Sequence, residues 1–480
     1  MPRPFPTSWI LLPAVALAGC VSYEPDPLDP AKELAALRTR GIPEVELVRS
    51  TAGPLVPRGA AFDPADGLDE AELVAVALTL NPELRARRLE AGEARAALIQ
   101  AGLWPNPEVG LSVARGLESG AGTTVDFDFL FELLRGAERS ARIDAATAKV
   151  EEVRAGIVAE EWRLAAEVRR QRLAVLAAER EVSLLGEEAA LRERTRETVR
   201  RRRDMGEGTE VEVAASDLEV AEVRRETLRA EGEVEAARRE LARLLGLPPG
   251  YALRIVGSGD PLPVEVLPDV PEAEIDRRLL AGRPDLKALE AAYKRAEHEL
   301  RLAVERQYPH LNLGPLITRE DDGAWHAGPS IGLELPLFDR NQGEIAEKEA
   351  QRARARAEYV AALQRARAEA MDALGRMRRV RTELDAFEKE VLPLVQRTQD
   401  LAERAFRAGE VGVLDWITAQ QRALTTRKAL LESAVRYRAA ALDFEAAVGP
   451  PPEAIDAGSG RDKDAGPPGE QPPAGPRRQR

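Results

Sequence analysis

Strict alternation of apolar and polar residues is confined to four short segments of the chain. It is clearest in residues 123–132, where the apolar positions are Val125, Phe127, Phe129 and Phe131 and the polar positions include Asp126, Asp128 and Glu132. The other three segments are residues 108–115, 311–319 and 328–337. Because successive side chains of a strand point to opposite faces, the pattern predicts four β-strands, each with one apolar and one polar face.

Two very long segments follow the strands and have the composition of helices. Gly136 to Met205 comprises about 70 residues without proline, which as a helix would be roughly 105 Å long. Arg340 to Ala408 is of similar length but contains Pro393, which is predicted to kink or segment the helix. Helices of this length are uncommon in compact domains and are typical of coiled coils, helical arrays or tubes.

The chain is duplicated, with matching positions about 203 residues apart. Leu80-Asn81-Pro82 matches Arg283-Pro284, Gly206 matches Gly409, and Gly246 matches Gly449. The pattern therefore predicts the same order of elements in each half: helix, strand, strand, very long helix, glycine turn and long helix. The expected organisation is a signal peptide in residues 1–19, an anchor and linker in 20–66, the first repeat in 67–248, a connecting segment in 249–271, the second repeat in 272–449, and a tail of disordered composition in 450–480.

The two-faced strands fit a membrane barrel better than a soluble sheet. Apolar residues every second position over about ten residues suit a strand that faces lipid on one side and a lumen on the other. Asp126, Asp128 and Glu334 are then expected to line the lumen, while Trp104 and Tyr308 precede the first strand of each half, where an interfacial aromatic belt is expected. A sheet in a bilayer must close, and four strands are too few, so several copies are expected to share one barrel. The alternative is two soluble hairpins, each packed on a core.

The single cysteine, Cys20, ends the segment "ILLPAVALAGC". Arg3 and the apolar run after it predict an export signal too short to span a bilayer. "LAGC" resembles a bacterial lipoprotein signal, which implies cleavage before Cys20 and lipidation of its side chain. Val21 follows in place of the aspartate that retains many lipoproteins at the inner membrane, which favours the outer membrane. The alternative is an ordinary signal peptide with a cysteine present by chance.

Charge and motif content argue against several other classes of protein. Charged residues make up 31% of the chain and the formal net charge is −13, which argues against nucleic acid as the main partner. There is no glycine-rich phosphate loop, so energy for transport would come from a partner protein. His298, His310 and His326 lack the spacing of zinc ligands. We therefore expect no catalytic residues, no metal site and no cofactor.

The whole ordered pattern, over roughly residues 66–449, resembles the TolC-type outer-membrane efflux factors. The matching features are the duplicated halves, the helix openings at Leu80 and Arg283, the glycine turns and the lipoprotein start. The resemblance implies a mostly helical α+β chain that forms a homotrimer, in which four strands per protomer close a transmembrane β-barrel continuous with a periplasmic tunnel of long helices. It also implies a passive duct, not an enzyme, that docks onto an inner-membrane pump through a periplasmic adaptor. "LFDRNQG" is most similar to the branch that serves heavy-metal cation exporters.

The same resemblance places the periplasmic tip at the two glycine turns. Gly206, Glu207, Gly208, Gly409 and Glu410 are expected to contact the adaptor. Acidic residues after the second turn constrict the tunnel in the family; Asp415 occupies the first such position, and Glu212 is its equivalent in the first half. Thr418 occupies the second position, a departure from the acidic pattern. The alternative for Asp415 and Glu212 is a role as solvated residues of the tip.

A second hypothesis of another class is a structural periplasmic coiled-coil lipoprotein that acts as a spacer with soluble hairpins. The two-faced strands and the regular duplication favour the channel. The exported substrate is left open between metal cations and drugs, because the pump and the adaptor select most of it.

Overall fold

The computed structural model describes residues 23–44, 46–48, 66–115, 117, 122–133, 135–257 and 270–449. The chain divides into two compact units, residues 1–41 and 42–480. In the first unit, helix α2 (Pro30–Arg38) begins after Asp29, whose side chain accepts hydrogen bonds from the backbone N–H groups of Ala31 and Lys32. The signal peptide expected in residues 1–19, Cys20, and the tail expected in 450–480 lie outside the described residues.

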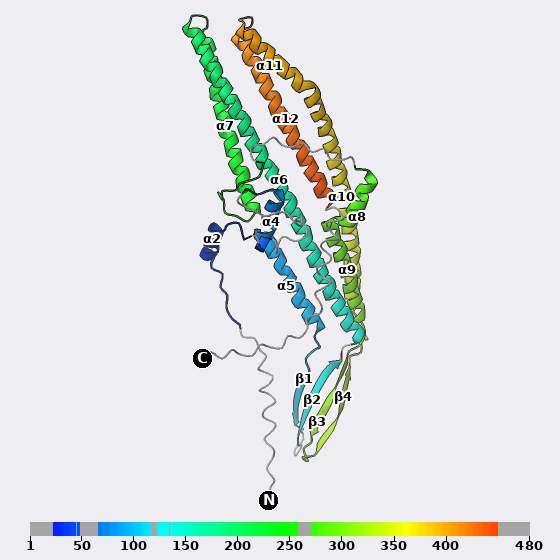
Figure 1. Cartoon of the computed structure of the whole chain (residues 1–480). Helices are drawn as coiled ribbons and strands as arrows, with labels where there is room; N and C mark the ends of the chain where they lie inside the picture. Colours follow the sequence, from blue (N-terminus) through cyan, green and yellow to red (C-terminus); the bar gives the residue numbers. More distant parts are fainter. Residues whose placement is uncertain are drawn as a thin grey trace. The chain divides into compact units, whose positions relative to one another are not determined.

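The second unit contains the duplicated halves (Figure 1). The first half consists of α4 (Glu70–Leu80), α5 (Pro82–Gly102), β1 (Glu108–Arg115), β2 (Thr123–Leu133), α6 (Gly136–Asp204) and α7 (Glu210–Leu244). The second half consists of α8 (Glu272–Gly282), α9 (Pro284–Glu305), β3 (Leu311–Arg319), β4 (Trp325–Leu333), α10 (Gln342–Ala386), the π-helix η3 (Phe387–Val391), α11 (Leu392–Arg407) and α12 (Val413–Val448). The mostly helical fold with four strands in one chain matches the fold expected from the sequence.

The four strands form one antiparallel sheet in the order β1-β2-β3-β4. In the register, Val109 lies opposite Phe129, and Phe131 lies opposite Leu313, so the apolar positions of adjacent strands share one face. The strand predicted at 328–337 overlaps β4 at residues 328–333 but is shifted toward the C-terminus, because β4 runs from Trp325 to Leu333. The β3–β4 ladder ends at the pair of Leu311 with Leu333, and further on the Leu337 N–H bonds the carbonyl of Leu335 at 2.8 Å. Glu334 therefore lies just beyond the sheet.

The long helices differ in one respect between the halves. Helix α6 is continuous over 69 residues, as the absence of proline predicted. Its counterpart is divided into α10 and α11 by the π-helix Phe387–Val391, and Pro393 lies in the first turn of α11. Proline cannot donate an interior hydrogen bond, so a break of the regular ladder just before it is the expected consequence.

A hydrophobic core lies where the shorter helices meet the long ones in each half. In the first half, Leu73, Leu78 and Leu84 pack with Leu164 and Leu241 from α6 and α7. In the second half, the corresponding cluster includes Ile275, Leu279, Leu286, Leu374 and Tyr437. Leu253 and Ile255, expected in a connecting segment, join the first core, and Ile255 forms a parallel bridge with Leu68.

In each half, a side chain just before the second short helix donates a hydrogen bond to a carbonyl at the end of the last helix, but the residue type differs between the halves. The Asn81 amide donates to the carbonyl of Leu244 at 2.9 Å, which ties the start of α5 to the end of α7. At the matching place, the Arg283 guanidinium donates to the carbonyl of Ala447 at 2.7 Å, which ties α9 to α12. Both bonds satisfy carbonyls that the end of a helix leaves without partners.

Candidate functional site

The sheet has one apolar face and one polar face. On β1, Val109, Leu111 and Val113 are between 60% and 70% exposed. On the opposite face, the carboxylate of Asp126 accepts hydrogen bonds from Thr318 Oγ1 at 2.7 Å and Ser112 Oγ at 3.1 Å. Asp126 is therefore held between its neighbours on β1 and β3.

Asp128, the second acidic residue of this face, lies over the backbone of β1. A Cβ added to Gly110 would overlap the Asp128 carboxylate, so the glycine provides the space that this side chain occupies. Asp126 and Asp128, both expected in the lumen, thus share the polar face of the sheet. Glu334 instead lies in the segment after β4 and lines a cavity of about 380 Å³ with Arg306, Tyr308 and His310.

The two predicted interfacial aromatic residues occupy equivalent positions after α5 and α9. Trp104 and Tyr308 are 56% and 50% exposed. The guanidinium of Arg139 lies 5.4 Å from the ring centroid of Trp104, and that of Arg135 lies 4.2 Å from the ring centroid of Tyr308. Both arginines lie at the start of α6, and at these distances each makes a cation–π contact.

Arginines of α6 also hold the end of α5. Arg142 donates to the carbonyls of Ala101 at 2.9 Å and Leu103 at 2.6 Å, and Arg139 donates to that of Gly102 at 2.8 Å. Cationic donors are favourable at the carbonyl end of a helix. Side chains at the start of α6, just after β2, therefore hold the end of α5, just before β1.

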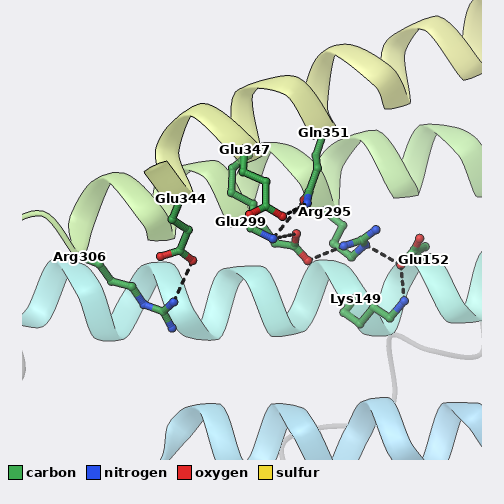
Figure 2. A network of polar contacts seen from close by, with 9 residues as sticks. Lys149, Glu152, Arg295, Glu299, Arg306, Glu344, Glu347 and Gln351 are labelled. Atoms are coloured by element: carbon green, nitrogen blue, oxygen red, sulfur yellow. Dashed lines mark hydrogen bonds and ion pairs between the residues drawn. The ribbon is translucent and has the colours of Figure 1, made fainter. Parts of the chain in front are cut away.

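A row of alternating charges joins α6, α9 and α10 near this junction (Figure 2). Glu152 of α6 accepts from Lys149 and Arg295, both at 2.8 Å, and Arg295 also pairs with Glu299. Lys348 of α10 lies 3.0 Å from Glu299. Burial raises the pKa of Glu299, but hydrogen bonds from Lys348 and Arg295 outweigh it, so its pKa lies below the usual value. Glu299 is consequently ionised at neutral pH, and the row acts as a polar seam between the helices.

The two turns predicted at the tip have the same hydrogen bonding. Gly206 and Gly409 have φ of 79° and 75°, in the left-handed region that favours glycine. The Glu207 N–H bonds the carbonyl of Arg202, and the Glu410 N–H bonds that of Ala405, both at 2.8 Å. These are Schellman motifs at the ends of α6 and α11. Apart from the half-buried Gly208, the five residues expected to contact an adaptor are exposed at these turns.

The two acidic residues predicted at the gate have unlike environments. Glu212 forms a capping box at the start of α7: its carboxylate accepts from the backbone N–H of Thr209 at 2.7 Å, and its own N–H bonds Thr209 Oγ1. Asp415 is exposed in the first turn of α12, and Thr418 lies one turn further along the same exposed face. The motif Thr-x-x-Glu at residues 209–212 is the local sequence signal for this cap, which was not predicted.

One contact at the tip was missed by the sequence analysis. The rings of Phe406 on α11 and Trp416 on α12 stack with centroids 4.5 Å apart, and the guanidinium of Arg202 on α6 lies 5.7 Å from the Phe406 ring centroid. Val199, Val213, Val413 and Ile417 form a small buried cluster beside them. These residues join the α6–α7 hairpin to the α11–α12 hairpin, a contact between halves that no local pattern could indicate.

The described residues lack two features. None of their helices combines the length and the apolar character needed to cross a membrane. Across the same part of the chain, histidine, cysteine, aspartate and glutamate side chains form no group of three or more arranged to hold a metal ion.

Comparison with known proteins identifies the family. The family model "Outer membrane efflux protein" matches residues 73–247 and 277–450, one match in each half. The cobalt-zinc-cadmium resistance protein CzcC of Cupriavidus metallidurans is 26% identical over 385 residues, which cover 80% of this chain and 88% of that protein. Among solved structures, the outer-membrane channel OprN matches with a TM-score of 0.67 at 20% identity, covering 83% of this chain and 95% of its own. The outer membrane protein VceC of Vibrio cholerae matches with a TM-score of 0.64 at 19% identity, covering 80% and 96%. The chain belongs to the outer membrane efflux protein family.

Proposed function

We propose that this protein is the outer-membrane channel of a tripartite efflux system, a passive duct through which a pump and a periplasmic adaptor export their substrate. The observation that best supports it is the apolar face of the sheet, where Val109, Leu111 and Val113 of β1 and Ile331 of β4 are all at least 60% exposed. A continuous apolar face of this kind indicates a contact surface. In the proposed barrel, lipid covers the apolar face of the sheet, and the opposite polar face lies against water in the lumen.

Closure of the sheet requires further copies of the chain. In the order β1-β2-β3-β4, the outer strands β1 and β4 are the edges. Edges exposed to lipid would leave backbone N–H and C=O groups without partners, at several kcal/mol each. In the proposed homotrimer, β4 of one copy pairs with β1 of the next, and twelve strands form one barrel. Trp104 and Tyr308 then lie at its periplasmic rim.

The proposed cargo is a metal cation. Asp126 and Asp128 on the polar face would place carboxylates from each copy around the lumen, which favours cations. The relative CzcC is named for resistance to cobalt, zinc and cadmium. Both observations agree with the resemblance of "LFDRNQG" to the heavy-metal branch.

At the other end, the glycine turns would meet the adaptor and the acidic residues would form the gate. Gly206, Glu207, Gly208, Gly409 and Glu410 would contact the adaptor. In a trimer, three Asp415 and three Glu212 carboxylates would surround one opening, which would attract multivalent cations. Thr418, in place of a second acid on α12, would make this ring less acidic than the family pattern. At the N-terminus, Cys20 is proposed to be the lipidated first residue of the mature protein.

Conductance in planar lipid bilayers tests both the channel and the gate. The purified full-length protein should produce cation-selective channels that trivalent cations block. In a variant with Asp415→Asn and Glu212→Gln, the half-blocking concentration should rise at least about fivefold, because one carboxylate–cation contact in water is worth about 1 kcal/mol or more. Glutamine preserves the capping box of α7, so the variant should fold.

A control variant distinguishes the channel from the acidic gate. A variant with Glu207→Gln and Glu410→Gln removes the same number of charges from the exposed turns and should block like the wild type. Equal block in all three proteins would place the gate elsewhere. Absence of any conductance from correctly folded protein would refute the channel and favour the periplasmic spacer.

A further inference from the structure

Two ion pairs join α9, in the second half of the chain, to α6, in the first half. Arg295 Nε lies 2.8 Å from Glu152 Oε2, a contact drawn in Figure 2, and the two side chains are 28% and 20% exposed. About two turns nearer the sheet, Arg301 lies 3.3 Å from Asp144. In both pairs the acidic residue is on α6 and the basic residue is on α9.

The internal repeat gives each residue of these helices a counterpart 202 positions away. Three pairs with this offset are buried in both halves: Leu84 and Leu286, Ala94 and Ala296, and Val168 and Ala370. The first two pairs align α5 with α9, and the third aligns α6 with α10. The surfaces through which α6 and α9 meet therefore have counterparts on α10 and α5.

The counterpart of the first ion pair has its charges exchanged. Glu152 corresponds to Arg354 of α10, and Arg295 corresponds to Glu93 of α5. Arg354 is 75% exposed and lies 3.5 Å from Glu358 of its own helix. Glu93 is exposed as well. A basic residue of α10 and an acidic residue of α5 are thus available for a contact outside the chain.

The counterpart of the second ion pair is apolar. Asp144 corresponds to Ala346 of α10, and Arg301 corresponds to Ile99 of α5, which is 69% exposed. Ala148, between the two acidic residues of α6, is 3% exposed, whereas its counterpart Ala350 is exposed. The face of α10 that corresponds to the covered face of α6 is therefore uncovered in one copy.

The order of the sheet indicates what covers this face. Strand β2, which leads into α6, pairs with β3, which follows α9. In a closed barrel, β4, which leads into α10, pairs with β1 of the next copy, which follows α5. Helix α10 then lies beside α5 of the next copy, as α6 lies beside α9 within the chain. The occupant is a second copy of this chain.

We propose that Arg354 of one copy pairs with Glu93 of the next copy and that Ala346 packs against Ile99 of the next copy. The pairing rests on the proposed homotrimer and identifies the residues through which its copies recognise one another. Charges and apolar side chains are complementary at both positions, as the facing surfaces of an interface require.

The exchange of charges makes the two kinds of half alternate around the ring. A first half that met another first half would place Glu93 against Glu152. Two second halves would place Arg295 against Arg354. Like charges across a contact disfavour both arrangements, and each would also set a charge of one ion pair against an apolar side chain. Each half therefore accepts only a half of the other kind.

The correspondence ends further from the sheet. Arg170 of α6 pairs with Asp443 of α12 at 2.8 Å, but their counterparts Asp372 and Glu240 are both acidic. Glu240 instead pairs with Arg243 of its own helix at 2.7 Å. The proposed contact is therefore confined to the part of α10 nearer the sheet.

Reversal of the charges in the full-length protein tests the pairing through the amount of SDS-resistant oligomer in outer membranes. Arg354→Glu and Glu93→Arg each place like charges at every contact between copies. Each should reduce the oligomer at least about threefold, because one exposed pair changes an equilibrium by about 1.4-fold to fivefold and a trimer repeats it three times. The double variant restores opposite charges and should recover nearly the wild-type amount.

Arg356→Glu is the matched control, because it makes the same charge change on α10 about 200° around the helix from Arg354. It should assemble like the wild type. A double variant no better than the single variants, or equal loss in Arg356→Glu, would overturn the pairing and leave the channel intact, since the wild type would still form conducting oligomers. A wild type without any oligomer would overturn the homotrimer and the pairing together.

Cross-linking with a short bis-maleimide measures the alternation directly. A chain with both Ile99→Cys and Ala346→Cys should form covalent oligomers. Each single variant should give no more than the wild type, which already contains Cys20, because α5 does not meet α5 and α10 does not meet α10. Cross-linking of Ile99→Cys alone at the level of the double variant, or none in a double variant that forms oligomers, would refute the proposed contact.

Discussion

The sheet offers a sharp test at Gly314, in the middle of β3. A Cβ added at this position would overlap the backbone carbonyl oxygen of Phe129 on β2. Neither Gly314 nor Gly328, on β4, has positive φ, so a side chain would cause no conformational strain at either position. At Gly328 an added Cβ would meet no atom within 4 Å. Gly314→Ala therefore tests the close approach of two strands, and Gly328→Ala is its control.

The loss of stability expected for Gly314→Ala depends on how the overlap can be relieved. The overlap at Gly314 is with backbone, so no side-chain rotation relieves it and the strands must move apart. Overpacking of this kind typically costs about 1–3 kcal/mol. Separation also weakens the β2–β3 ladder beside Phe129, where backbone groups in a bilayer have no water to bond. We expect a loss of at least about 2 kcal/mol, which is roughly a thirtyfold change in the folding equilibrium.

The assay is the temperature at which the assembled protein in outer membranes loses its resistance to SDS, together with the amount assembled. Gly314→Ala should lower both. Gly328→Ala should match the wild type or exceed it slightly, because alanine restricts the unfolded chain by about 0.4–1 kcal/mol. The reasoning is refuted if Gly314→Ala assembles and resists heating like the wild type, or if both variants lose stability equally.

Two further predictions concern the membrane. An arginine at Phe129, on the apolar face, should cost about 2–4 kcal/mol of membrane stability, whereas an arginine at Asp128, on the polar face, should cost much less; equal losses in heat-resistance assays would favour a soluble hairpin. Metabolic labelling with a palmitate analogue should mark the wild type and not Cys20→Ala, and equal labelling of the two would exclude lipidation at this cysteine.

The features predicted well from the sequence are those set by local pattern. Alternation predicted residues 108–115 and 311–319 as strands, and these are the bounds of β1 and β3. The unbroken helix from Gly136 and the interruption before Pro393 also follow from residues at the positions concerned. The fourth strand was predicted too far toward the C-terminus, because the alternation of apolar residues continues through Leu335 and Leu337, beyond the last ladder pair at Leu333.

The contacts that were not predicted join residues distant in the sequence. The ring of His310 lies between carboxylates that are more than 170 residues earlier in the chain, and Arg202 reaches Phe406 across the two hairpins. Periodicity describes which face a residue occupies but not which other element covers that face. Glu212 shows a different limit, because its local capping motif defines the partner of its carboxylate but not whether it also faces an opening.

The even number of strands has a consequence for how copies can meet. In an antiparallel sheet with the order β1-β2-β3-β4, the first and last strands run in opposite directions. When β4 of one copy pairs with β1 of the next, these two strands are also antiparallel, whatever the number of copies. Every pair of neighbouring strands in a closed ring is then antiparallel. A chain with three or five strands would place a parallel seam between copies. Each half of the duplicated chain contributes one hairpin, which already has this even count. A chain with two hairpins therefore contributes twice as many strands to the ring as a chain with one, and its two edge strands still run in opposite directions.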